Sequence, residues 1–123
     1  MRVTLFTSNK NRHNYFINLL SQVSEKIFVI QECEIINAGK ILGNYRSSSI
    51  LKKYFENVDH AQNKLFGNSS VNNLNKNIKI LSIPFGDLNK YSISFLSEFL
   101  ESDLYIVFGS SYIKGNLVNF LMN

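Results

Sequence analysis

The chain has 123 residues, of which 45% are hydrophobic, including ten Phe and six Tyr. That is enough to fill the core of one domain, so we expect a single domain over residues 1–123. A mean hydropathy of −0.05 argues against disorder and against a membrane protein. The N-terminus lacks the apolar stretch of a signal peptide, which predicts a cytoplasmic protein. A lone cysteine, Cys33, excludes an internal disulfide and a cysteine-rich metal site, so we expect no metal.

The net charge of +4 lies entirely in residues 1–64. Several of these cations fall in or beside predicted loops, which would suit a phosphate-bearing ligand, although a scattered solvated surface is an equal alternative. No nucleic-acid motif accompanies them, so a nucleic-acid partner is not expected. The cations in question are Lys10, Arg12, Lys40, Arg46, Lys52 and Lys53.

The first elements alternate between strand and helix. Residues 2–7 and 27–30 are short apolar, β-rich runs, which predict buried strands. Between them, apolar residues recur at helical spacing, with Ser8 or Asn9 available as N-cap. These residues are Tyr15, Phe16, Leu19, Leu20 and Val23.

The middle of the chain predicts a second helix and a polar connector. Residues 47–49 can cap a helix that ends at Gly67 and whose apolar stripe includes Leu51, Tyr54, Phe55 and Val58. Residues 68–77 are almost wholly polar and predict a connector.

The last third repeats the alternation. Residues 78–83 predict a strand closed by Pro84, and Asp87 can cap the helix that follows. Residues 104–108 predict a fourth strand, and Leu117 begins one more helix. The inward face of the first of these helices should comprise Leu88, Tyr91, Phe95, Leu96, Phe99 and Leu100.

Strands that alternate with helices at this spacing predict an α/β fold, a Rossmann-like three-layer sandwich with a mostly parallel sheet of about four strands. Ligands of such sheets bind beyond the carboxyl ends of the strands, where the strand order reverses. The functional edge should therefore comprise residues 7–13, 32–36 and 109–114.

The loop at residues 7–13 offers hydroxyls, amides and two cations at a helix N-terminus, a setting that favours anions. It has neither the glycine fingerprint of NAD and FAD sites nor a Walker pattern. Arg12 could hold a phosphate or carboxylate with two hydrogen bonds. The alternative for Arg12 and His13 is a solvated first helical turn.

After the fourth strand the chain reads Gly109-Ser110-Ser111-Tyr112-Ile113. A strand that runs into Gly-Ser-Ser can expose main-chain groups that read a flat heterocycle. The alternative is an ordinary turn in which Ser110 or Ser111 caps the next helix.

Both ends of the chain resemble one family. Residues 2–9, followed by Arg12-His13-Asn14-Tyr15-Phe16, are similar to the opening of folate-dependent sugar N-formyltransferases, relatives of methionyl-tRNA formyltransferase. Residues 107–121 resemble the segment that leads into the catalytic core of those enzymes.

The resemblance implies N10-formyltetrahydrofolate as cofactor and a primary amine, on a nucleotide-linked amino sugar, as the small-molecule substrate. It implies that the cofactor lies along Gly109, Ser110, Ser111, Tyr112 and Ile113. It also implies that Asn9, Lys10, Arg12 and His13 lie on the side of the site that binds the amine substrate.

The family's catalytic Asn, His and Asp have no match in this sequence, since His13, His60, Asp87 and Asp103 do not align with them. We therefore assign no catalytic residue and expect an N-terminal domain that stops before the catalytic motif. The alternative is a non-catalytic Rossmann-like module that binds folate or a nucleotide. A sheet that stops at the fourth strand would leave an exposed apolar edge there, which predicts self-association into a homo-oligomer.

Overall fold

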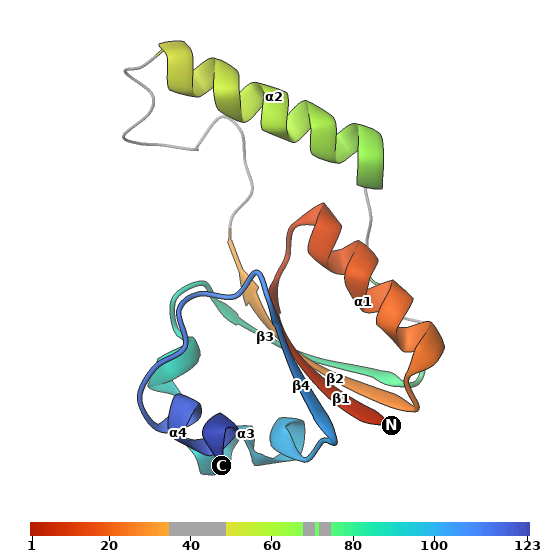
Figure 1. The fold of residues 1–123 in the computed structure, drawn as a ribbon, viewed down its shortest axis with the longest axis vertical. Coiled ribbons are helices and arrows are strands. Elements are labelled where there is room, and N and C mark those ends of the chain that lie inside the picture. The colour runs from red at the N-terminus through yellow and green to blue at the C-terminus, as the bar shows by residue number, and fades with distance from the viewer. Residues whose placement is uncertain (35–48, 68–70, 72–74) are drawn as a thin grey trace.

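Four parallel strands form one sheet in the computed structural model, which describes residues 1–34, 49–67, 71 and 75–123. The strands pair in the order β3-β2-β1-β4 (Figure 1). Helices cover both faces of the sheet, so the predicted Rossmann-like three-layer sandwich is confirmed. The strands are β1 (Arg2–Ser8), β2 (Lys26–Cys33), β3 (Ile78–Pro84) and β4 (Leu104–Phe108).

The helices divide between the two faces. Helix α1 (Asn11–Val23) covers one face, and α3 (Ile93–Leu100) and α4 (Asn116–Met122) cover the other. Helix α2 (Ser49–Phe66) lies outside α1, and a 3-10 turn, η2 (Leu88–Lys90), precedes α3.

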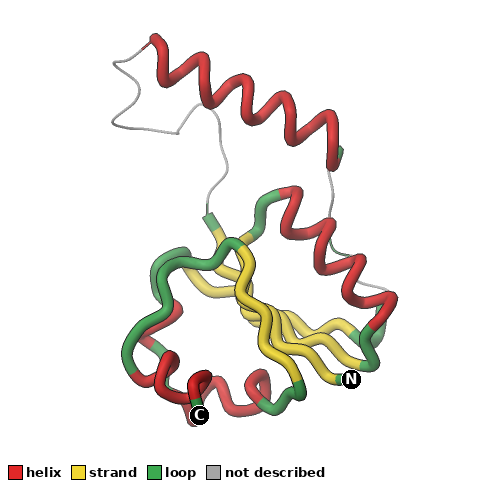
Figure 2. The backbone as a smooth tube through the Cα atoms, viewed as in Figure 1, coloured by secondary structure: helices red, strands yellow, loops and turns green. Residues whose placement is uncertain are grey.

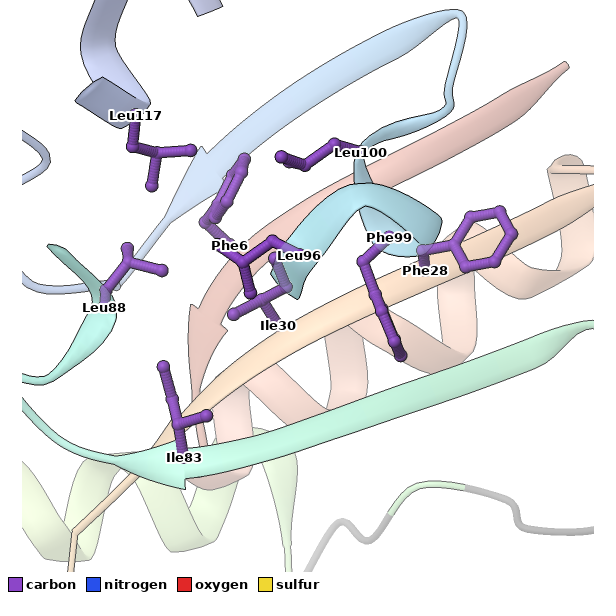
Figure 3. Close-up of a cluster of buried hydrophobic side chains, with 9 residues drawn as sticks. All are labelled: Phe6, Phe28, Ile30, Ile83, Leu88, Leu96, Phe99, Leu100 and Leu117. Carbon is purple, nitrogen blue, oxygen red and sulfur yellow. The ribbon is translucent and has the colours of Figure 1, made fainter. Parts of the chain in front are cut away.

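Strand β1 supplies the core on both faces because its side chains alternate. Leu5 packs with Ile17 of α1, whereas Phe6 packs with Leu96 and Leu117 on the opposite face. Figure 3 shows this second cluster, in which buried side chains of three strands meet those of η2, α3 and α4. The continuous apolar runs in the sequence arise from burial on both faces.

The order of the strands reverses between β1 and β4. From β1 the chain moves outward to β2 and then β3, and it returns to place β4 on the other side of β1. The loops that follow the two strands lead to helices on opposite faces of the sheet, and such a reversal is where open α/β sheets bind ligands. Strand β4 is an edge strand, and Leu104 and Val107 on it are exposed. Self-association through this edge stays a prediction.

Helix α2 ends at Phe66 and is followed by Gly67 with a φ of 61°, as predicted. Of its predicted apolar stripe, Tyr54 is 59% exposed and Val58 is half-buried, and Leu65 farther along the helix is 73% exposed. The helix contacts α1 at few points, of which one is the ring of Phe66, 5.6 Å from that of Tyr15. Residues 47 and 48, which were predicted to cap it, lie outside the described residues.

Two helix caps differ from the prediction. Asp87 precedes the η2 turn, and Ser92 caps α3 by accepting a hydrogen bond from the Phe95 amide. Phe95, which was predicted to face inward, is largely exposed. At α1 the cap position falls on Lys10, because the side chains of Ser8 and Asn9 are engaged elsewhere.

Two buried threonines of β1 offer a matched test of hydrogen bonding. Thr4 donates to the Phe99 carbonyl at 2.5 Å, whereas the buried Thr7 hydroxyl has no hydrogen-bond partner among the described residues. We expect Thr4→Val to lower the free energy of unfolding by about 1–2 kcal/mol, because it leaves a buried carbonyl unpaired. Thr7→Val should be neutral or stabilising. Urea denaturation of both variants tests this pair, and equal losses would contradict it.

No helix in the described part of the chain is long and apolar enough to cross a bilayer.

Candidate ligand-binding site

The candidate site lies at the carboxyl ends of β1 and β4. Figure 2 shows the loops that leave the strands at this end of the sheet, away from the N-terminus. Two of the three predicted segments, residues 7–13 and 109–114, flank the point where the strand order reverses. Of the third segment, residues 35–36 lie outside the described part of the chain.

His13 joins the segments at residues 7–13 and 109–114. It occupies the first turn of α1, only 2% of it is exposed, and its Nδ1 lies 2.5 Å from the Ser8 hydroxyl. The edge of its ring meets Phe108 at the end of β4, with the ring centroids 4.9 Å apart. The alternative of a solvated first turn is therefore wrong for His13.

Gly109 allows this approach. Its φ of 84° lies in the left-handed region, and a Cβ at this position would stand 2.2 Å from His13 Nε2. Gly109 also forms a bridge with Thr7, so the ends of β1 and β4 are joined directly. The absence of a side chain at residue 109 brings the two loops into contact.

The imidazole of His13 is neutral at neutral pH. Burial, together with the smaller effect of the charges of Arg12 and Lys10, lowers its pKa from 6.5 to about 4. The ring thus serves as a hydrogen-bonding group, and positive charge at this loop comes from Arg12 and Lys10.

The other residues predicted for the amine side have distinct surroundings. The Asn9 amide donates to the Glu34 carbonyl and accepts from the Glu34 amide, which ties the loop to the end of β2. Arg12 Nη1 donates to Gln62 of α2 at 2.5 Å. Lys10 is half-buried at the start of α1, and its side chain makes no cap hydrogen bond. Asn9 therefore shapes the loop, and Arg12 faces α2.

The segment after β4 is fixed at several points. Ile113 packs against the core, and Asn89 of η2 donates to the Tyr112 carbonyl and accepts from the Lys114 amide. The N-cap of α4 is Gly115, so neither serine of the segment caps this helix. The side chain of Tyr112 is 85% exposed.

Glu32 is a residue of the candidate site that the sequence did not single out within residues 32–36. Its buried carboxylate accepts from the Gly86 amide at 2.7 Å, from the Ser111 amide at 2.6 Å and from the Ser111 hydroxyl at 2.8 Å. A glutamate two residues after a buried apolar run is the only local signal, because its partners come from two distant turns.

An apolar groove of about 390 Å³ opens between the segment after β4 and helix α4. Main-chain and side-chain atoms of the predicted cofactor segment form one wall, and α4 forms the other. The lining residues are Val107, Ser110, Ser111, Tyr112, Ile113, Val118, Leu121 and Met122. Its volume is within the range of small-molecule sites, roughly 300–1,000 Å³.

The described residues contain no cluster of His, Cys, Asp or Glu that could hold a metal ion. Fold and geometry define a Rossmann-like α/β domain with a candidate site at its topological switch point. No protein-family model, no curated protein and no solved structure matches this chain.

Proposed function

We propose that this chain forms the cofactor-binding part of a 10-formyltetrahydrofolate-dependent N-formyltransferase that acts on a primary amine of a nucleotide-linked amino sugar. The observation that carries the proposal is the groove beside β4. It is lined by four of the five residues to which the resemblance assigns the cofactor.

The groove suits the pterin end of a reduced folate. Its walls are apolar side chains, among them Val107, Val118 and Leu121, against which a flat ring can pack. The Ser111 amide and hydroxyl are bonded to Glu32, and the Ser111 carbonyl accepts from the Ser110 hydroxyl. The main chain of Ser110 would therefore help to fix the orientation of a heterocycle, and packing against the apolar walls would do the rest. Bound there, the cofactor would supply the formyl group.

The contact between the two loops supports the second half of the proposal. The loop to which the resemblance assigns the amine meets the cofactor segment where His13 lies against Gly109. The two predicted parts of the site therefore meet at one edge of the sheet, although the side chain of Arg12 faces α2. The positive charge of Arg12 and Lys10 suits the phosphates of a nucleotide-linked substrate.

A second candidate function is a non-catalytic module that binds folate or a nucleotide. The burial of His13 favours it, because an imidazole held by Ser8 and Phe108 is poorly placed to exchange protons with a substrate. The two candidates differ in the ligands they hold: a module binds one ligand, whereas the cofactor-binding part of a transferase holds the cofactor beside an amino-sugar nucleotide.

Calorimetry with 10-formyl-5,8-dideazafolate, a stable analogue of the cofactor, tests the proposal. We expect saturable binding, and Val118→Gln should raise Kd at least tenfold by placing a polar group in the groove wall. Asn119→Gln, next to it on α4 but exposed, is the control and should bind like the wild type. No heat at millimolar ligand contradicts the first candidate and the folate-binding form of the second. Calorimetry with an amino-sugar nucleotide, added to protein saturated with the analogue, separates the two candidates: the first binds both ligands at once, whereas the second binds only one.

A further inference from the structure

The carboxylate of Glu32 joins three segments that are far apart in the sequence. Glu32 lies near the end of β2 and is fully buried. Its carboxylate accepts hydrogen bonds from the amide of Gly86 after β3 and from the amide and hydroxyl of Ser111 after β4. The carboxyl ends of three strands are thus tied to one side chain.

This arrangement depends on a carboxylate. A buried carboxylate is costly unless donors surround it, and hydrogen bonds to it are about twice as strong as neutral ones. All the partners of Glu32 among the described residues are N–H and O–H donors. A glutamine here would direct its own NH₂ group at a main-chain N–H, because only one of its two terminal atoms accepts.

Asn89 provides a second anchor for the same segment. Its side chain holds the carbonyl of Tyr112 at 2.6 Å and the amide of Lys114 at 2.8 Å. Ser111, Tyr112 and Lys114, three residues of a four-residue stretch, are thus held by the side chains of Glu32 and Asn89. A segment ordered before its ligand arrives does not lose conformational entropy on binding, which strengthens the affinity.

We propose that Glu32 is a positioning residue that acts through Ser111 to preset the wall of the groove for its ligand. The identity of that ligand rests on the proposed function, whereas the ordering of the segment does not.

Amide hydrogen exchange of the free protein, followed by NMR, tests the ordering. In Glu32→Gln we expect the amides of Ser111 and Gly86 to exchange at least tenfold faster relative to the core amide of Val29. The control is Glu98→Gln, which removes an exposed carboxylate paired with Lys79 and should leave both amides unchanged. Unchanged exchange of Ser111 in Glu32→Gln overturns the proposal.

Affinity for 10-formyl-5,8-dideazafolate tests the positioning role. We expect Glu32→Gln to raise Kd at least tenfold. Ser111→Ala keeps the hydrogen bond from the main-chain amide of residue 111 to Glu32 and should raise Kd less. Faster exchange with an unchanged Kd would mean that Glu32 is only structural, and the proposal falls.

Two further outcomes are also decisive. If the wild type does not bind the analogue, the proposed function fails, and the exchange experiment alone decides whether Glu32 orders the segment. If Glu32→Gln does not fold, Ser111→Ala replaces it. In that variant the Ser111 amide should still exchange severalfold faster and Kd should rise, and wild-type values for both overturn the proposal.

Discussion

Gly109→Ala should lower the free energy of unfolding by roughly 3 kcal/mol, the sum of left-handed strain and overpacking. A side chain at φ 84° is strained on its own, and the added Cβ would lie 2.2 Å from His13 Nε2. His13 cannot retreat easily, because Ser8 and Phe108 hold its ring from other sides. Urea denaturation of the variant and the wild type measures the loss.

Gly86 is the matched control for this substitution. Its φ of 90° imposes nearly the same strain, but no atom of the described residues lies within 4 Å of the position that a Cβ would take. Gly86→Ala should therefore cost only about 1–2 kcal/mol. In a His13→Ala background, Gly109→Ala should fall to the same value because the collision is gone. Equal costs for both glycines in the wild-type background would refute the role assigned to His13.

The sheet could be predicted from the sequence because its signals are local. Strand β4 has the predicted bounds, and β3 ends at the predicted Pro84. Continuous apolar runs separated by helical spacing require a parallel sheet covered on both faces, whatever the details of the loops. The strand order β3-β2-β1-β4 carries no such local signal and required the structure.

Helix caps were harder to predict, because Ser, Asn and Asp serve turns as readily as caps. Asp87 begins the η2 turn, and the extended residue Tyr91 delays the start of α3 until after Ser92. Asn9, a suitable cap by sequence, bonds instead to the main chain of Glu34 across the sheet edge. A tertiary partner decided the case of Asn9, whereas the local backbone decided that of Asp87.

The site could be predicted as an edge but not as a set of contacts. Parallel strands end at a common edge, which is enough to bring residues 7–13 and 109–114 near each other. The contact of His13 with Gly109 and the donors around Glu32 depend on the paths of three loops in space. No spacing in the sequence encodes them.

Acid should destabilise this domain through His13. Burial, reinforced by the nearby charges of Arg12 and Lys10, lowers the pKa of His13 from 6.5 to about 4, so the folded state resists protonation. Between these two pKa values the unfolded chain binds a proton that the folded chain does not, and stability falls as pH falls. The full effect is about 3 kcal/mol, of which about 2 kcal/mol is lost between pH 7 and pH 5.

Urea denaturation at pH 7 and pH 5 measures this loss in three proteins. His13→Gln cannot be protonated, so its stability should change less between the two pH values than that of the wild type, by about 2 kcal/mol. His60→Gln removes the other histidine, which is exposed on α2, and should follow the wild type. Contributions from groups that all three proteins share cancel in the comparison. If the wild type and His13→Gln lose the same stability, the imidazole of His13 is not held neutral by the fold.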